Sequence, residues 1–140
     1  MKNFMNPEKT AALVQKANEA RSQSYIPYSN FSVGAALLCA DGSIYTGANI
    51  ENASYTPTVC AERVAFFSAI HDGKRDFTAI AIVGAPSGKA PVELCPPCGV
   101  CLQVMSEFCS GDFEIILADE KNTRILTLDE LLPHRFTLIK

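Results

Sequence analysis

Three cysteines and one glutamate have the residue types and the spacing of a metal site with an acid–base group beside it. Cys60 precedes Glu62 by two positions, and Cys98 and Cys101 form a Cys-x-x-Cys pair further along the chain. Thiolates bind zinc in tetrahedral geometry, and catalytic sites with three protein ligands keep the fourth position open for water. Glu62 could carry protons to and from that water without binding the metal. The pattern predicts one Zn²⁺ held by Cys60, Cys98 and Cys101, with Glu62 as the catalytic group.

Two other interpretations of these cysteines stay open at this point. A structural zinc site would use the same spacing with a fourth protein ligand. The only histidines, His71 and His134, lie far from the cysteine clusters in the sequence. A redox-active pair would need Cys98 and Cys101 alone, which leaves the first cysteine and its nearby glutamate unexplained.

Composition and charge restrict the class of protein. The chain has 140 residues, 48% of them hydrophobic, which suits a single domain over residues 1–140 without disulfide bonds. A formal net charge of −3, without a stripe of Lys and Arg, makes nucleic acid a poor partner. Residues 1–9 lack a signal-peptide core and no run could cross a bilayer, so we expect a cytoplasmic protein. Three further cysteines, expected to be thiols, have no assigned role: Cys39, Cys95 and Cys109.

Periodicity and turn residues predict the elements that must position these groups. Asn6 and Pro7 suit a helix cap and a first helical residue, and apolar residues then recur at helical spacing to about Arg21. Two apolar runs on either side of Asp41-Gly42 indicate a β-hairpin. The predicted helices are 7–21, 60–71, 98–111 and a short one capped by Thr127, and the predicted strands are 31–39, 43–49, 77–83, 113–118 and 124–128.

The order of these elements, α-β-β-α-β-α-β-β-α, predicts an α/β fold with three layers (α/β/α) and a five-stranded mixed sheet. A helix between two strands implies a crossover, which normally joins parallel strands. Residues 85–97 form one long, proline-rich loop, and long loops often border sites. Both cysteine clusters then lie at helix starts, where backbone N–H groups stabilise thiolates. Arg63 either adds positive charge there or is an exposed surface residue.

Several further runs match one known family in sequence and in order. They are Tyr28-Ser29-Asn30-Phe31, Val33-Gly34-Ala35-Ala36, Asn49-Ile50-Glu51-Asn52-Ala53, Cys60-Ala61-Glu62-Arg63 and Leu131-Leu132-Pro133. With them, the chain resembles the small, homotetrameric, zinc-dependent cytidine deaminases over residues 7–136. The resemblance implies the cytidine deaminase-like fold and one Zn²⁺ per subunit. It also implies hydrolytic deamination of cytidine and 2'-deoxycytidine to uridine and 2'-deoxyuridine with release of ammonia, as in pyrimidine salvage.

The resemblance also assigns roles that spacing alone leaves open. Glu62 would protonate N3 of cytosine and pass a second proton to the departing amine. Phe31, which could otherwise be an ordinary core aromatic, would pack against the base, and the backbone of Ala61 would orient the base. Asn49 and Glu51 would hydrogen-bond the ribose. A carboxylate there would repel a phosphate, which favours nucleosides over nucleotides.

The family's tetramer closes each active site with residues from neighbouring subunits. The loop from Ala53 to Tyr55 and the C-terminal Phe136 match those elements, although Phe136 would serve equally well in a core. Arg63 matches an arginine that hydrogen-bonds the ligand thiolates. Two places depart from the family pattern: the residue after the last ligand is usually arginine and is Leu102 here, and the segment Thr56-Pro57-Thr58-Val59 is not the one expected before Cys60. Residues around the ligands tune the acidity of metal-bound water, so the sequence does not fix the rate or the pH optimum of the reaction.

Two functions compete with deamination of a nucleoside. One is a related zinc deaminase with another small substrate, such as blasticidin S, and the other is a non-catalytic structural zinc domain. Blasticidin deaminases share the three-cysteine design but lack the full Asn-Ile-Glu-Asn run of residues 49–52. Deaminases of nucleic acids and nucleotides generally have histidine at the position of Cys60. A preference between ribose and deoxyribose does not follow from the sequence.

Overall fold

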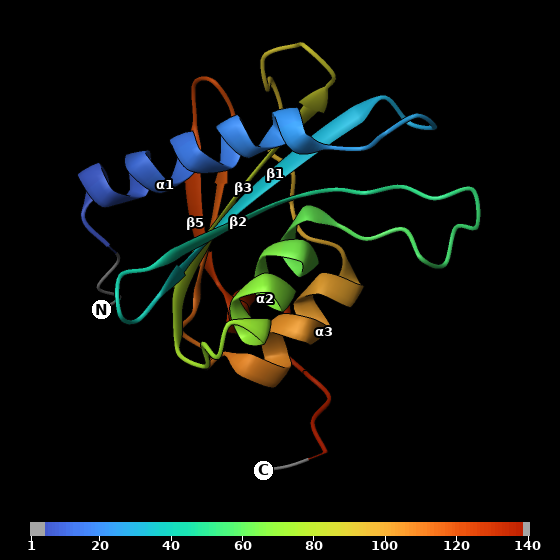
Figure 1. Ribbon diagram of the computed structural model, residues 1–140. Helices are drawn as coiled ribbons and strands as arrows, with labels where there is room; N and C mark the ends of the chain where they lie inside the picture. Colours follow the sequence, from blue (N-terminus) through green and yellow to red (C-terminus); the bar gives the residue numbers. More distant parts are fainter. Residues whose placement is uncertain (1–4, 139–140) are drawn as a thin grey trace.

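The computed structural model describes residues 5–138, and its elements follow the predicted order (Figure 1). Every predicted helix and strand is present, with ends that differ by a few residues at most. A short 3₁₀ turn, η1, also follows the first helix. The elements are α1 (Pro7–Ala20), η1 (Arg21–Gln23), β1 (Phe31–Cys39), β2 (Ile44–Ala48), α2 (Ala61–His71), β3 (Phe77–Pro86), α3 (Gly99–Phe108), β4 (Glu114–Ala118), β5 (Thr123–Thr127) and α4 (Leu128–Leu131).

The five strands form one mixed sheet in the order β2-β1-β3-β4-β5. β1 pairs antiparallel with β2 and β3, β3 pairs parallel with β4, and β4 pairs antiparallel with β5. β3 lies in the centre of the sheet, as its unbroken apolar run predicts. β2 and β3 run in the same direction, as the crossover through α2 requires, but β1 lies between them.

β3 is longer than the sequence predicts. The apolar run ends at Val83, and Gly84 and Pro86 are poor strand formers. The strand nevertheless continues to Pro86, because Phe31 at the start of β1 pairs with Pro86. This long-range pairing brings the start of β1 and the end of β3 to the same edge of the sheet.

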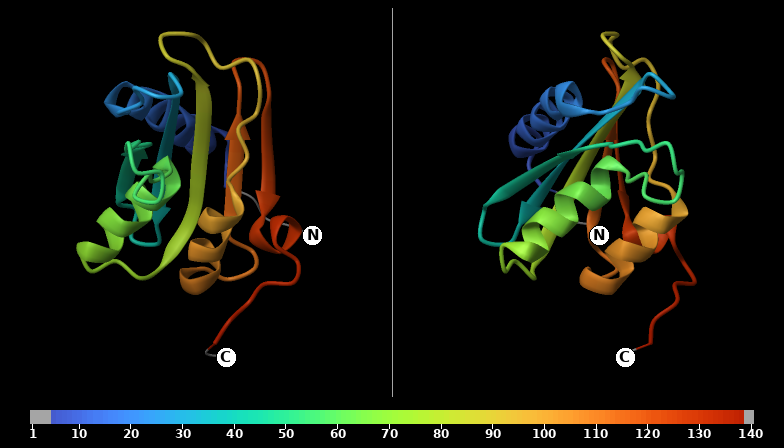
Figure 2. Two further views of the ribbon diagram at one scale, coloured as in Figure 1. Left: turned by 90° about the vertical axis from the view of Figure 1, so that its right-hand side faces the viewer. Right: turned by 45° about the vertical axis from the view of Figure 1, so that its right-hand side comes forward.

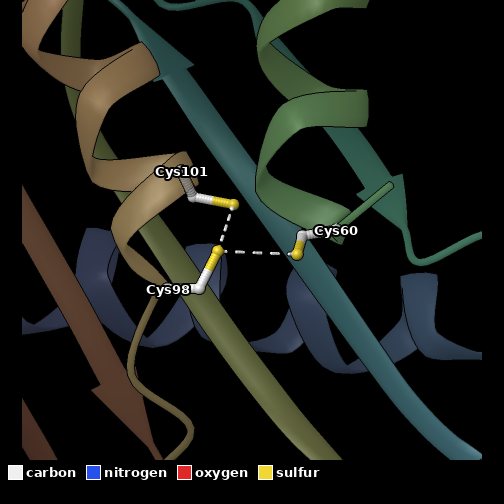
Figure 3. Close-up of side chains that lie close together, drawn as sticks. All are labelled: Cys60, Cys98 and Cys101. Carbon is white, nitrogen blue, oxygen red and sulfur yellow. Dashed lines mark hydrogen bonds between the residues drawn. The ribbon is translucent and has the colours of Figure 1, made fainter. Parts of the chain in front are cut away.

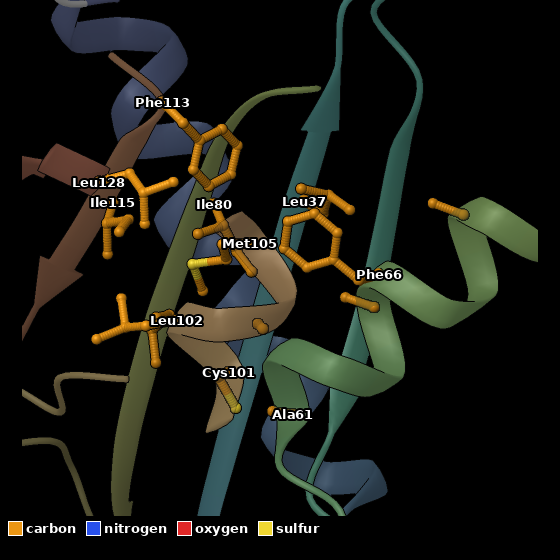
Figure 4. Close-up of a cluster of buried hydrophobic side chains, with 14 of the residues drawn as sticks. Leu37, Ala61, Phe66, Ile80, Cys101, Leu102, Met105, Phe113, Ile115 and Leu128 are labelled. Carbon is orange, nitrogen blue, oxygen red and sulfur yellow. The ribbon is translucent and has the colours of Figure 1, made fainter. Parts of the chain in front are cut away.

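Helices cover both faces of the sheet and make the three predicted layers (Figure 2). α1 packs closely on one face, where a Cβ atom at Gly34 would lie 1.9 Å from the carbonyl oxygen of Ala17. α2 and α3 pack on the other face, where Phe66 and Met105 are fully buried (Figure 4). Within residues 5–138, no helix is long and apolar enough to span a membrane.

The helices differ in how they begin. Asn6 caps α1 as predicted, and its side chain accepts a backbone hydrogen bond at 2.8 Å. Thr127 caps α4 in a reciprocal capping box with Glu130. Cys60 and Cys98 occupy the cap positions of α2 and α3, but neither side chain bonds the helix backbone. The cap side chains therefore leave the first amides of these two helices, such as that of Ala61, without a side-chain cap.

Candidate active site

Two helix starts bring three sulfur atoms together (Figure 3). Cys60 is the cap residue of α2, Cys98 is the cap residue of α3, and Cys101 lies in the first turn of α3. The Sγ atoms of Cys60 and Cys98 are 3.8 Å apart, and those of Cys98 and Cys101 are 3.5 Å apart. All three lie within 4.8 Å of one another. The fold thus gathers the cysteines that the sequence motif groups.

The three sulfur atoms suit a tetrahedral zinc ion. Zn–S bonds are about 2.3 Å long, so two sulfurs of a tetrahedral site lie about 3.8 Å apart, close to the observed separations. Within residues 5–138, no histidine, carboxylate or further cysteine joins the cluster. Cys98 is exposed whereas Cys101 is buried, so solvent reaches one side. Three thiolates with access for water make the catalytic rather than the structural type of site.

Arg63 and the two helix starts stabilise the thiolate form. Nη2 of Arg63 donates a hydrogen bond to Sγ of Cys60 at 3.5 Å, and the uncapped starts of α2 and α3 add their dipoles. Hydrogen bonding with the Cys101 thiol, helped by Arg63, lowers the pKa of Cys60, and the same interaction raises the pKa of Cys101. One thiolate therefore forms first, and metal binding releases the remaining thiol protons.

Glu62 lies in the first turn of α2 and is only 4% exposed. Its Oε1 atom is buried and has no hydrogen-bond partner among the residues that the structure describes. Burial raises the pKa of Glu62 to about 7, and the negative charge of Cys60 contributes to the rise. A carboxyl group whose pKa is near neutrality exchanges protons readily in both directions.

The carboxyl group of Glu62 should cost stability in the metal-free protein. Its pKa rises from an ordinary value of 4.5 to about 7 on folding, so stability present below pH 4.5 is lost as the pH rises through 7. After chelation, we expect Glu62→Gln to be more stable than wild type by up to about 3 kcal/mol at pH 8. The difference should shrink toward pH 5. Urea unfolding at both pH values measures it, and an identical pH dependence in the two proteins would contradict the raised pKa.

Leu102 does not face the thiolates. Its side chain is buried in the hydrophobic core, on the side of α3 where Leu128 and Ile115 lie (Figure 4). Among the described residues, Arg63 is the one arginine hydrogen-bonded to a sulfur of the cluster. The thiolate charge is therefore balanced by Arg63 and the helix starts, without a second arginine.

The residues expected to bind a nucleoside meet at the start of β1. Phe31, the first residue of that strand, is 39% exposed. The side chain of Asn49 accepts from the Val33 amide and donates to the Phe31 carbonyl, each at 3.0 Å. Glu51 accepts hydrogen bonds from the Ser29 hydroxyl and from the backbone amides of Tyr28 and Ser29, in the turn before β1. These hydrogen bonds lower the pKa of Glu51. Asn49 and Glu51 thus also support the backbone around Phe31, a role that their spacing does not indicate.

Cys95 connects this region with the sulfur cluster. A Cβ atom at Gly84 would lie 2.8 Å from the Cys95 sulfur and 3.0 Å from Cε1 of Phe31, so glycine lets both side chains lie over β3. Burial, with the negative charges of Glu62 and Cys60, raises the pKa of the Cys95 thiol to about 11. Cys95 therefore lies near both the Phe31 ring and Glu62. No sequence pattern marks Cys95 or Gly84, because the contact joins separate elements.

The other predicted site residues lie in different surroundings. Ala61 is fully buried and is the first residue of α2. Ala53 and Tyr55 lie in the loop between β2 and α2, where Tyr55 is 83% exposed. Phe136 is 65% exposed, and its carbonyl oxygen accepts a hydrogen bond from Gln103 at 3.0 Å. Neither of these two aromatic rings is buried in the core of this chain.

A three-layer α/β/α fold with an accessible three-thiolate site and a buried glutamate defines a zinc-dependent hydrolytic enzyme. The family model of the cytidine and deoxycytidylate deaminase zinc-binding region matches residues 7–117. The chain belongs to this family of deaminases.

Individual relatives agree with this assignment. The chain is 51% identical to a cytidine deaminase of Halalkalibacterium halodurans over 126 residues, which are 89% of this chain and 92% of that protein. It is 31% identical to a blasticidin-S deaminase of Bacillus cereus over 140 residues, 98% and 99% of the two chains. A crystal structure of cytidine deaminase from Burkholderia pseudomallei matches with a TM-score of 0.83 and 42% identity, over 94% of this chain and 100% of that one. The predicted fold and zinc cofactor are confirmed.

Proposed function

We propose that this protein catalyses the zinc-dependent hydrolytic deamination of cytidine and 2'-deoxycytidine in pyrimidine salvage. The observation that carries the proposal is the buried Oε1 atom of Glu62, which has no partner among residues 5–138 and belongs to a carboxyl group close enough to interact with Cys60 and Cys101. Hydrolytic deamination needs such a group, because protons must move from water to the base and to the amine. The 51% identity to a cytidine deaminase over 89% of the chain supports the choice of substrate.

The chemistry divides between the metal ligands and Glu62. Cys60, Cys98 and Cys101 would hold the zinc ion, whose Lewis acidity makes water nucleophilic near neutral pH. The carboxylate of Glu62 takes one proton from the attacking water and delivers it to N3 as the C4–O bond forms. Glu62 then moves the remaining hydroxyl proton to the amine, the C4–N bond breaks, and uridine and ammonia leave. A pKa of about 7 for Glu62 suits both transfers.

Four residues would bind the nucleoside. The partly exposed ring of Phe31 offers a surface for the base, and the Ala61 amide at the uncapped start of α2 offers a donor to the edge of the base. Asn49 and Glu51 retain unused hydrogen-bonding capacity beside their bonds to the backbone, which suits a sugar hydroxyl. The Glu51 carboxylate would repel a 5'-phosphate and so favour nucleosides.

Ultraviolet absorbance tests this function directly. The purified protein is incubated with cytidine, 2'-deoxycytidine, cytidine monophosphate and blasticidin S, before and after chelation of zinc. We expect rapid, zinc-dependent loss of the absorbance of the two nucleosides, with the monophosphate spared. A protein that holds one zinc ion per chain but converts none of the four compounds would contradict the proposal and favour a structural site.

Blasticidin S is the second candidate substrate, because a blasticidin-S deaminase matches 98% of this chain. Its identity of 31% is well below the 51% identity to a cytidine deaminase. The full run Asn49-Ile50-Glu51-Asn52 also favours a nucleoside over the antibiotic. Conversion of blasticidin S without conversion of cytidine would reverse this order.

Glu51→Ala is expected to lower kcat/KM for cytidine by about 10- to 100-fold, because a hydrogen bond between a charged group and a sugar hydroxyl is lost. The loss should appear in both KM and kcat if the contact strengthens in the transition state. 2',3'-Dideoxycytidine lacks the 2' and the 3' hydroxyl of the sugar. On this substrate, wild type and variant should react at similar rates. Steady-state kinetics on the two substrates measures the difference.

Ser29→Ala separates sugar binding from support of the backbone. This change removes the Ser29 hydroxyl, which donates to Glu51 and accepts from the Phe31 amide at 3.1 Å, but leaves the Glu51 carboxylate in place. We expect a change in kcat/KM of less than about 3-fold. If Ser29→Ala reproduces the full loss, or if Glu51→Ala is equally damaging on the dideoxy substrate, Glu51 acts through the fold and not on the sugar.

We also propose a homotetramer with shared active sites. Tyr55 and Phe136 are large aromatic residues that this chain leaves exposed, and the resemblance places such residues over the pocket of a neighbouring subunit. Burial of exposed aromatic rings between subunits would favour assembly. Sedimentation equilibrium should give the mass of four chains, and a monomer that is fully active would contradict shared sites.

A further inference from the structure

Arg21 joins three segments at one end of the sheet. It directly follows α1, and its Nε atom donates to the Ser32 hydroxyl at 3.0 Å and to the Ser32 carbonyl at 3.3 Å. Nη1 donates to the side-chain oxygen of Asn18 at 2.9 Å. Nη2 donates to the carbonyls of Lys89 at 2.8 Å and Pro86 at 3.3 Å. One guanidinium group thus holds the end of α1, the start of β1 and the loop after β3.

The acceptors of Arg21 are all uncharged. The salt bridges found among residues 5–138 join other groups and do not include this arginine. A planar guanidinium presents several N–H groups in fixed directions and reaches several carbonyl oxygens at once, which the compact ammonium of lysine does less well. The contribution of Arg21 therefore depends on the geometry of its fork more than on its charge.

One connection of Arg21 leads to Phe31. Ser32 follows Phe31 in β1, is only 4% exposed, and donates from its hydroxyl to the Ala85 carbonyl at 3.2 Å. Phe31 itself pairs with Pro86 across the two strands. Arg21 accordingly binds Ser32, which follows Phe31 in β1, and Pro86, which pairs with Phe31 on β3. The backbone next to Phe31 is therefore held both along its own strand and on the neighbouring strand.

The other connection leads to the loop that ends at Cys98. Arg21 holds the first turn of this loop through two carbonyl groups. Further along, the Cys95 sulfur and the Phe31 ring both lie within 3.0 Å of the position that a Cβ atom of Gly84 would occupy. The loop then reaches Cys98 at the start of α3, and Figure 2 shows its course from the end of β3 to that helix.

We propose that Arg21 is a positioning residue that sets one wall of the substrate pocket, by holding Phe31 and the loop before Cys98 relative to each other. This inference rests on the proposed function, in which Phe31 contacts the base. The bonds of Arg21 reach neither the three sulfur atoms nor Glu62. Its loss should therefore weaken substrate binding without removing zinc.

Arg21→Met and Arg21→Lys test this role by kinetics. We expect KM for cytidine to rise about 3- to 10-fold in both variants, because lysine keeps the charge but loses the fork. kcat should stay within about twofold of wild type, and zinc should stay at one ion per chain. In a Phe31→Leu background, Arg21→Met should raise KM little further, because both changes act on the same wall.

Hydrogen–deuterium exchange gives a readout that needs no substrate. In the first turn of the loop, the Ser87 amide donates to the Asn30 carbonyl at 2.9 Å, and the Lys89 amide donates to the Pro86 carbonyl at 3.0 Å. These two amides should exchange about 10-fold faster or more in both Arg21 variants, because the turn opens more often without the guanidinium.

Arg75→Met is the matched control. Arg75 also donates to two carbonyls, those of Ile70 and Lys74 at 2.9 and 2.7 Å, but it lies after the far end of α2. The Arg75→Met variant should lose stability without a change in KM for cytidine or in the exchange of the Ser87 and Lys89 amides. Wild-type KM and exchange in Arg21→Met, full rescue by lysine, or an additive effect with Phe31→Leu would each overturn the inference. If wild type converts no cytidine, the proposed function fails, while exchange still decides whether Arg21 holds the loop.

Discussion

Glu62→Gln is expected to lower kcat for cytidine by about 10⁴-fold or more while the protein keeps one zinc ion per chain. Glutamine has nearly the same shape as glutamate, but its amide neither accepts nor releases the required protons. In the proposed mechanism two successive transfers depend on this carboxyl group, so the loss should reach or exceed the upper range for a single acid–base group. KM should change less, because the amide still fills the buried position of Glu62. Single-turnover assays measure the loss of rate, and metal analysis measures the zinc content.

Glu114→Gln is the matched control for this experiment. Glu114 is also a buried glutamate, but it lies on β4 and accepts hydrogen bonds from the Met5 amide. Its replacement should alter kcat by less than about twofold, because it has no contact with the sulfur cluster. If Glu62→Gln kept more than about one-hundredth of the wild-type rate, Glu62 would not be the proton carrier. Loss of zinc from that variant would place the effect in the metal site.

Element ends were predictable where one residue dictates the local backbone. Asn6 starts α1 and Thr127 starts α4 because each side chain caps free amide groups. The end of β3 was not predictable in this way, since Gly84 and Pro86 indicate a break, and only the pairing with β1 extends the strand. The position of β1 between β2 and β3 is likewise a property of the whole sheet. Sequence patterns carry propensity and spacing, but they do not carry register across distant strands.

The same distinction separates the metal centre from its surroundings. The three cysteines and Glu62 were predictable because two short runs at helix starts contain them all. Cys95 and Gly84 lie against the Phe31 ring, and Arg21 binds the backbone beside Phe31, so these residues come from separate elements and each looks ordinary within its own segment. Their roles arise from contacts across the sheet, so only the folded structure reveals them.

Cys101→Ser is expected to remove both zinc and activity. Within residues 5–138, the cluster has three ligand groups and no substitute for any of them. A serine hydroxyl does not replace a thiolate as a zinc ligand. After dialysis, zinc content should fall below about 0.1 per chain, and kcat should fall by at least about 10³-fold. Added zinc should restore chelated wild type but not the variant, as metal analysis and the cytidine assay would show.

Cys109→Ala is the control that separates loss of a ligand from loss of packing. Cys101 is 1% exposed and also belongs to the hydrophobic core, so its replacement disturbs both. Cys109 is a free, partly buried cysteine at the opposite end of α3, packed against the same core. Cys109→Ala should therefore lose some stability but keep zinc and turnover. If Cys101→Ser kept its zinc, or Cys109→Ala lost it, the metal would depend on ligands other than the three-sulfur cluster, and the charge balance assigned to Arg63 would no longer apply.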